Sequence, residues 1–229
     1  LQCRINPDDL PTESEDYYVP PTKVHQEHHA QDDVTTIMIL GDDSFAADRS
    51  DNGLAAYLAK YTGATIYNCA LEGTSIANKT PALDYDTYPL DSFSAYRITA
   101  CLQHNKFTLL DYTLTIMPEK PDYFDSTVEL IKNIDLDTVD IIILSYGIND
   151  YLAGHITTDV NDEEGNVASV FGALTRTVRL YKEFFPHIQI VISSPAYAYY
   201  TEEDGSLIGG DLRRTGTQTS ATLGDYMIN

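Results

Sequence analysis

The stretch Val139–Asp150, "VDIIILSYGIND", joins an uninterrupted apolar run to a polar glycine turn. The run is short and rich in isoleucine, which predicts a strand that is buried on both faces of a sheet. Strands of this kind belong to parallel sheets, because the crossover helices cover both faces. We therefore expect the polar turn to lie at the carboxyl edge of the sheet, where such folds bind their ligands.

Other segments extend this pattern along the chain. Further strands are predicted over Val34–Leu40, Ala64–Leu71 and Ile188–Ser194, the last as another buried strand. Apolar residues at helical spacing predict helices over Asp51–Tyr61, Ser92–His104, Asp122–Asn133 and Val167–Phe185, whereas 107–118 is ambiguous. Strands that alternate with helices predict an α/β protein with a parallel sheet.

Composition limits the classes of function. The chain has 229 residues and a formal net charge of -21, so it repels phosphate backbones, and nucleic acid is not an expected partner. No apolar run approaches the roughly 20 residues of a membrane span, and we expect no transmembrane segment. The three cysteines form no C-x-x-C pair, which favours buried free thiols at Cys69 and Cys101.

Residues 1–33 differ from the rest of the chain. They are rich in proline, acidic residues and histidine and lack periodicity, which predicts an acidic N-terminal arm before one domain over 34–229. The arm's histidines (His25, His28, His29) have no further ligands at zinc spacing, so we expect no metal there. Nucleotide-binding glycine motifs are absent from the sequence, and we expect no cofactor.

Three turns end predicted strands and carry polar residues: Gly41–Ser44, Glu72–Thr74 and Tyr146–Asp150. Acyl transfer needs a nucleophile at such a turn and hydrogen-bond donors that face a developing oxyanion. The Gly73 N–H and the Asn149 amide are candidate donors. Each turn alone has a structural explanation, since glycines permit tight turns and Asn or Asp caps the next segment.

The three blocks together resemble a known family. "ILGDD" (Ile39–Asp43), "NCALEGTS" (Asn68–Ser75) and "YGIND" (Tyr146–Asp150) resemble the conserved blocks of SGNH (GDSL-type) hydrolases, which are serine esterases and acylhydrolases. The resemblance runs from about Val34 to the end of the chain. It implies a flavodoxin-like three-layer α/β/α fold.

The resemblance also implies site residues and a substrate class. Gly73 and Asn149 match the oxyanion-hole positions, and Asp42 and Asp150 match supporting positions. The expected substrates are O-acyl esters, acetyl esters included, of carbohydrates or small molecules. Because the blocks look like those of secreted or membrane-anchored members, we expect a location outside the cell or at its surface.

The nucleophile block departs from the family pattern. The family's nucleophile is the second residue after the glycine, and here that residue is Asp43, with Ser44 one position later. Either the turn has one extra residue and Ser44 is the nucleophile, or Asp43 replaces the serine. The ordinary spacing from Gly41 to Gly63 favours replacement. A carboxylate at this position would oppose the binding of an oxyanion.

A second departure concerns the general base. The family carries it in a late D-x-x-H block, and none of the six histidines here has an aspartate three residues before it. The final strand and helix of the fold look absent, and "TLGDYMIN" (Thr222–Asn229) resembles the start of the helix that leads to that strand. His155 is a candidate substitute base. A sheet without its last strand predicts a protein partner or second chain that completes it.

The sequence is compatible with three functions. The first is an active ester hydrolase with Ser44 as nucleophile. The second is a catalytically inactive binding or assembly module of the same fold, in which Asp43 replaces the serine. The third is a metal-dependent phosphatase in which Asp42, Asp43 and Asp150 hold Mg²⁺, although the chain lacks the D-x-D spacing of such enzymes.

Overall fold

The computed structural model describes residues 32–117, 119–215 and 221–228. The arm predicted over 1–33, with its three histidines and Cys3, lies outside the described residues except at Asp32 and Asp33.

The described chain builds a four-stranded parallel sheet in the order β2-β1-β3-β4. The strands are β1 (Thr36–Gly41), β2 (Thr65–Asn68), β3 (Ile141–Ser145) and β4 (Gln189–Ser193). This order equals the first four strands of the flavodoxin order. The prediction of a parallel α/β sheet is therefore confirmed, and every predicted strand is present.

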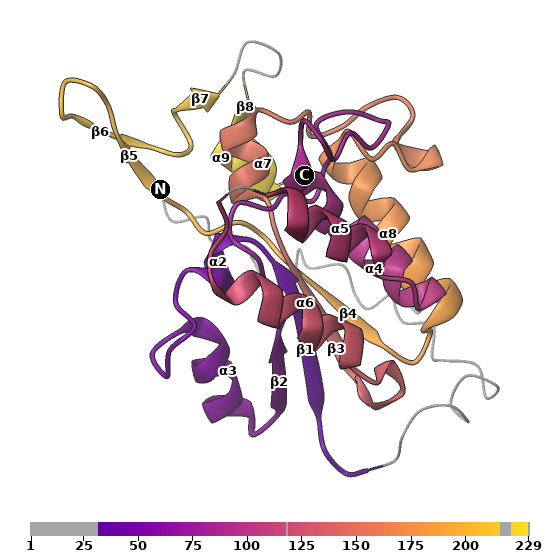
Figure 1. Ribbon diagram of the computed structural model, residues 1–229. Coiled ribbons are helices and arrows are strands. Elements are labelled where there is room, and N and C mark those ends of the chain that lie inside the picture. Colours follow the sequence, from indigo (N-terminus) through magenta and orange to yellow (C-terminus); the bar gives the residue numbers. More distant parts are fainter. Residues whose placement is uncertain (1–31, 118, 216–220, 229) are drawn as a thin grey trace, which may run out of the picture.

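Helices cover the two faces of this sheet unequally (Figure 1). They are α2 (Asp43–Ala46), α3 (Leu54–Thr62), α4 (Ala95–His104), α5 (Thr108–Ile116), α6 (Tyr123–Asn133), α7 (Ile148–Ala153), α8 (Val170–Phe184) and α9 (Leu223–Ile228). Each predicted helix is observed. The ambiguous segment 107–118 contains α5, and α9 forms where Thr222–Asn229 predicted the start of a helix. Short 3₁₀ turns occupy Pro89–Phe93, Leu136–Thr138 and Asp162–Glu164.

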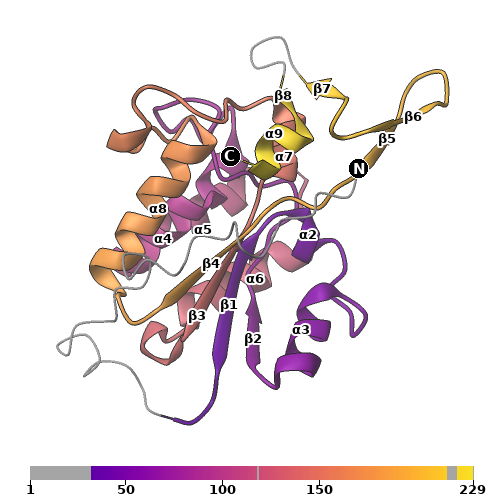
Figure 2. The same cartoon turned by 180° about the vertical axis from the view of Figure 1, so that it is seen from behind.

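Alternation along the strands divides the core into two parts. Met38 and Leu40 of β1 point to one face, where α4, α5, α6 and α8 supply the larger buried cluster. Ile37 and Ile39 point to the other face, where α3 supplies a much smaller cluster. Figure 2 shows this thinner face, with α3 beside β2.

The strand β4 differs from its prediction. It was expected to be buried, yet Val191 is 46% exposed and Ile192 is 54% exposed. Its burial pattern follows from its position, because β4 is an edge strand and no strand of the described chain pairs with its outer side. An apolar run predicts a strand but does not reveal whether both of its neighbours are present.

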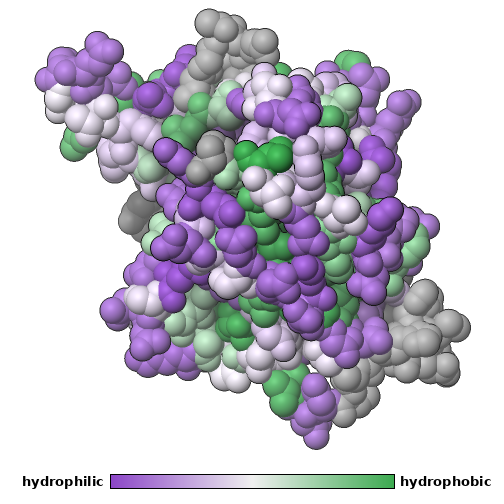
Figure 3. Space-filling view, viewed as in Figure 1, coloured by the Kyte–Doolittle hydropathy of each residue, from purple (hydrophilic) through white to green (hydrophobic). Residues whose placement is uncertain are grey.

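Small antiparallel pairs follow β4. The strands β5 (Tyr199–Thr201) and β6 (Leu207–Gly209) form a hairpin that projects from the body in Figure 1, and β7 (Arg214–Thr215) pairs with β8 (Ala221–Thr222). Hydrophilic residues cover most of the face seen in Figure 3, the tip of this hairpin included. Among the described residues, none of the helices is long and apolar enough to cross a bilayer.

Candidate functional site

The turn after β1 is tied to the turn after β3 through Asp42. Its backbone N–H donates to the Ser145 carbonyl at 2.9 Å. Its buried carboxyl accepts the Ser44 N–H through Oδ1 and the Ile148 N–H through Oδ2, both at 3.2 Å. Burial, reinforced by the charge of Asp150, raises the pKa of Asp42 to about 6 although these hydrogen bonds oppose the rise. Asp42 thus holds two strand ends together.

Asp43 lies against both candidate oxyanion donors. Its Oδ2 accepts the Gly73 N–H at 3.0 Å and also accepts a short hydrogen bond from the Asn149 side-chain amide. Three predicted site residues from three separate turns therefore meet at one oxygen atom. A carboxylate oxygen with two convergent N–H donors has the hydrogen bonding that the oxyanion of an acyl-transfer intermediate would need.

Ser44 has a different environment from Asp43. Its backbone N–H donates to Oδ1 of the Asp42 carboxyl at 3.2 Å. No hydrogen bond joins Ser44 to Gly73 or Asn149 in the described chain. The residue that faces the two donors is Asp43, at the position that the sequence resemblance assigns to the nucleophile, and not Ser44.

The loop that carries Gly73 is fixed from several sides. Gly73 has a φ of +78°, a backbone conformation that favours glycine. The next residue, Thr74, donates its hydroxyl to the Leu71 carbonyl at 2.7 Å, and its own carbonyl accepts the Asn149 amide at 3.0 Å. The Asn149 amide therefore bridges Thr74 and Asp43, which sets its orientation.

Asp150 joins the second and third turns from inside the protein. Its side chain is fully buried and accepts the N–H groups of Ile76 and Ala77, both at 2.9 Å. Its Oδ1 also lies 3.0 Å from Nδ1 of His155. Asp150 therefore fixes the position of the neighbouring Asn149 through bonds to the Gly73 loop.

His155 lies with Asp150 and not with the predicted nucleophiles. The imidazole is buried, and its Nε2 has no hydrogen-bond partner among the described residues. No hydrogen bond connects it to Asp43 or Ser44 in the described segments. Its place in the structure is that of a partner to the Asp150 carboxylate, and the predicted role of substitute base gains no contact that would support it.

Sequence reasoning missed Arg49 and Tyr123. The Arg49 guanidinium donates to the carbonyls of Ala70 and Asn68 at 2.9 and 2.8 Å and lies 4.5 Å from the centre of the Tyr123 ring. The Tyr123 hydroxyl accepts the N–H of Glu72, next to Gly73, at 3.0 Å. These two side chains hold the second turn, Glu72–Thr74, in position. The available signal was that Arg49 is the one basic residue, Lys or Arg, between Lys23 and Lys60 of a strongly acidic chain.

The aspartates do not form a cation site in the described residues. Asp42 and Asp150 direct their carboxylate oxygens to backbone N–H groups, as given above. Within the described ranges, no group of three or more His, Cys, Asp or Glu side chains is arranged to hold a metal ion. The phosphatase hypothesis therefore finds no structural support.

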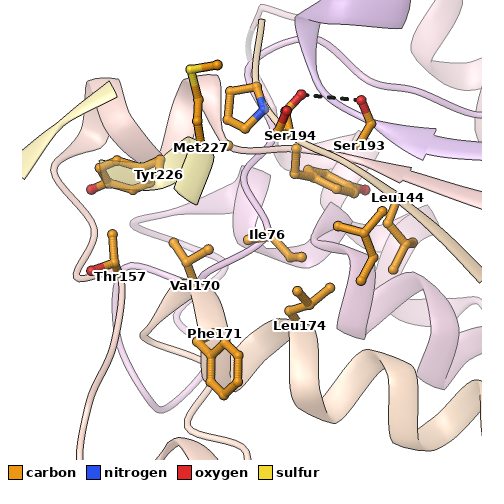
Figure 4. Close-up of a pocket in the computed structure, with 14 residues that line it drawn as sticks. Ile76, Leu144, Thr157, Val170, Phe171, Leu174, Ser193, Ser194, Tyr226 and Met227 are labelled. Carbon is orange, nitrogen blue, oxygen red and sulfur yellow. Dashed lines mark hydrogen bonds between the residues drawn. The ribbon is translucent and has the colours of Figure 1, made fainter. Parts of the chain in front are cut away.

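A cavity of about 280 Å³ lies beside the third turn and away from Asp43. Its walls come from the ends of β3 and β4, the first turns of α8, and α9. Figure 4 shows Ile76 near the centre of the lining residues, with Phe171 and Leu174 of α8 below it and Tyr226 and Met227 of α9 above it. Gly147 lines the cavity, whereas Asp43, Ser44, Gly73 and Asn149 do not. The cavity is mostly apolar and lacks the convergent donors of the Asp43 cluster.

Comparisons with known proteins identify the fold and no more. No known protein family matches the chain, and no curated protein matches it. One solved crystal structure aligns at a TM-score of 0.53 and 16% identity, over 85% of this chain and 70% of that one. At this identity the likeness shows a shared α/β fold.

Two further solved structures align less well. A possible lipase from Chitinophaga pinensis DSM 2588 has a TM-score of 0.47 at 14% identity, over 83% of this chain and 60% of its own. A protein from Lactobacillus plantarum has a TM-score of 0.46 at 17% identity, over 84% of this chain and 68% of its own. The chain thus spans 60 to 70% of the length of the structures it resembles.

Proposed function

We propose that this chain is an SGNH-type domain, related to ester hydrolases of O-acylated carbohydrates or small molecules, whose oxyanion site is filled by its own Asp43. In this arrangement the domain acts as a binding or assembly module and does not hydrolyse esters through a serine. Its proposed location is outside the cell or at the cell surface.

The observation that carries the proposal is the pair of hydrogen bonds to Asp43 Oδ2. The Gly73 N–H and the Asn149 amide are the two donors that the resemblance assigns to the oxyanion hole, and both are already engaged. A substrate carbonyl would have to displace a carboxylate. It would then develop negative charge beside that carboxylate, which opposes the transition state.

The contacts of the histidines in the described ranges support the same proposal. Serine nucleophiles are activated by a hydrogen-bonded histidine, and no histidine of the described residues is hydrogen-bonded to Ser44. The described ranges contain three histidines: His155 contacts Asp150, His187 lies 3.0 Å from the Leu136 carbonyl, and His104 is in the last turn of α4.

A second candidate function is ester hydrolysis with Ser44 as nucleophile. The favouring observation is that the donor pair exists at all, because Gly73 and Asn149 converge on one point although they come from turns far apart in sequence. If Asp43 moved aside, the donors would be free to bind a substrate oxygen.

Labelling with a fluorophosphonate probe separates the two candidates. We expect no labelling of the wild-type chain and no hydrolysis of p-nitrophenyl acetate beyond that of Ser44→Ala. An Asp43→Ala variant should free the donors and bind a small phosphonate at least about tenfold more tightly than wild type, since one unfavourable charge contact is worth about 1.4 kcal/mol or more. The matched control, Asp43→Ala with Asn149→Ala, should lose this gain. Probe attached to Ser44 in the wild type would instead establish the hydrolase.

A further inference from the structure

The helices α4 and α8 carry an excess of positive charge on a strongly acidic protein. The chain contains 35 acidic residues and 14 lysines and arginines, yet the two helices together contain one acidic residue, Glu183. Their basic residues are Arg97, Arg176, Arg179 and Lys182. The helices pack against each other on the thicker side of the sheet (Figure 1), so these positive charges gather in one part of the molecule.

Two of these arginines contact one aromatic ring. The centre of the Tyr96 ring lies 5.0 Å from the Cζ atom of Arg97 and 4.4 Å from that of Arg176. The two guanidinium carbons are therefore no farther apart than these distances combined. Burial lowers the pKa of Arg97, and the positive charge of Arg176 lowers it further. The two charges thus act on one another, which favours a negative group close to both.

Neither Arg97 nor Arg176 is paired with a carboxylate. Within the described residues, neither side chain forms an ion pair or donates a hydrogen bond. The negative charge of Asp91 acts on Arg97 without forming an ion pair, and the Asp91 carboxyl accepts the Lys79 N–H at 2.8 Å. The guanidinium groups therefore keep their hydrogen-bond donors for a partner from outside the described chain.

Two buried polar atoms at the start of α4 point to such a partner. The Nε atom of Arg97 and the Oγ atom of Ser94 are buried, and neither has a hydrogen-bond partner among the described residues. Ser94 precedes Arg97 by three residues, and residues with this spacing lie on the same face of a helix. Buried polar atoms in native proteins nearly always have a partner, so these two donors indicate a bound molecule that accepts hydrogen bonds.

Neighbouring residues hold the Arg176 side chain in place. A Cβ atom at Gly165 would lie only 3.1 to 3.4 Å from the side-chain carbons of Arg176, so the glycine provides the room that the arginine occupies. At the other end of the side chain, the guanidinium group contacts the Tyr96 ring. A guanidinium group that is already oriented loses less conformational freedom when it binds an anion.

We propose that Arg97 and Arg176 form a binding site for a phosphate group, either a free phosphate ion or the phosphate monoester of a small molecule. The two guanidinium charges match the two negative charges of this group, and their N–H donors fit its oxygen atoms. The Ser94 hydroxyl supplies a further donor. Because the chain as a whole has a net charge of -21, the ligand is small and not a polyanion. The site shares no residue with the Asp43 cluster, so it does not rest on the function proposed above.

Titration of the full chain with inorganic phosphate, followed by phosphorus NMR at constant ionic strength, tests the proposal. The titration is done at about pH 8, where phosphate carries two negative charges. We expect saturable binding of one phosphate per chain. Arg97→Gln and Arg176→Gln should each weaken binding at least about tenfold, because each removes charge-assisted hydrogen bonds. A wild-type chain that shows no saturable binding would overturn the proposal.

Lys60→Gln is the matched control. It removes one positive charge from an exposed position of α3, on the opposite face of the sheet, and should change the dissociation constant by less than about twofold. If it weakens binding as much as Arg176→Gln does, phosphate responds only to the total charge of the chain, and the site is wrong. Arg176 is itself exposed, so Arg176→Gln should keep the wild-type circular dichroism spectrum and separate loss of binding from loss of the fold.

Competing anions test the match of charges and the source of the phosphate group. Methyl sulfate carries one negative charge and should displace bound phosphate at least about tenfold more weakly than phosphate itself does, and chloride should not displace it. Equal competition by either anion would contradict a site that is built for two charges. Displacement by phenyl phosphate would identify a phosphate monoester as the ligand class, whereas binding of inorganic phosphate alone would identify the free ion.

Discussion

Two regions of the molecule differ in how their polar groups are paired. These regions are the turns after β1 and β3 and the outer edge of β4. In the turns, the carboxylates of Asp42, Asp43 and Asp150 accept hydrogen bonds from groups of the same chain. Along β4, the outward groups of Ile190 and Ile192 have no strand beside them in the described chain. Within the described residues, the site at the strand ends, where such folds usually bind ligands, is thus filled by the chain's own groups, whereas the outer side of β4 has no paired strand.

The largest expected effect on the free energy of unfolding comes from Asp150, in the turn after β3. Asp150→Ala would leave the N–H groups of Ile76 and Ala77 and the imidazole of His155 without their buried acceptor. We expect the free energy of unfolding to fall by about 4 kcal/mol, as measured by urea denaturation. Glu163→Ala, at an exposed position, is the control and should change it by less than about 0.5 kcal/mol. Equal small effects in both variants would show that the turns are not held by Asp150.

The next effect is a pH dependence that belongs to Asp42. Burial raises the pKa of this carboxyl to about 6 in the folded chain, whereas in an unfolded chain it titrates near about 3.9. Between these values the folded chain binds more protons than the unfolded chain, so the contribution of Asp42 to the free energy of unfolding falls as pH rises. The fall approaches about 3 kcal/mol and is complete above about pH 7.

Asp42→Asn should remove this contribution. The difference in unfolding free energy between variant and wild type should therefore move in favour of the variant by about 3 kcal/mol from about pH 4 to about pH 7. The measurement is a series of urea titrations at several pH values. A difference that stays constant with pH would mean that Asp42 is not held protonated by its burial.

The smallest effect is expected at the open edge. Val191→Ala removes a side chain that is about half exposed and should lower the free energy of unfolding by less than about 1 kcal/mol. Val128→Ala, the same change at a fully buried position of α6, should cost about 2 kcal/mol. If the two variants unfold alike in dilute solution, β4 is covered and the comparison between the two regions fails.

Much of the fold follows from patterns along the sequence. Apolar runs located every strand of the parallel sheet, and helical spacing located α4, α6 and α8 within a few residues. The burial of β4 was mispredicted because Ile188–Ser194 has the same apolar character as a central strand. Whether a strand is central depends on which other strands lie beside it, and this is a tertiary property that the run itself does not encode.

The candidate site was predictable in its members but not in its contacts. Gly73 and Asn149 were selected because they end parallel strands, and strand ends of a parallel sheet meet at one edge. That both would bond to Asp43, and that Ser44 would bond to Asp42, depends on side-chain rotamers in the first turn of α2. Arg49 was missed because its partners are backbone carbonyls, which leave no residue pattern in the sequence.

The central position of β1 has a consequence for the time course of synthesis. The Thr36 N–H bonds to Asp140, which follows it by 104 residues, and β3 begins just after that aspartate. At about 5 to 20 residues per second, a ribosome needs roughly 5 to 20 seconds to supply this partner. During that interval the side of β1 that pairs with β3 has no partner, although β2 is already available on its other side. Pairs of aspartates flank it, Asp32–Asp33 before and Asp42–Asp43 after, in the positions where charges restrain aggregation. The Asp43 carboxylate, which fills the site in the folded protein, is therefore also one of the charges that limit aggregation of β1 before β3 is synthesised.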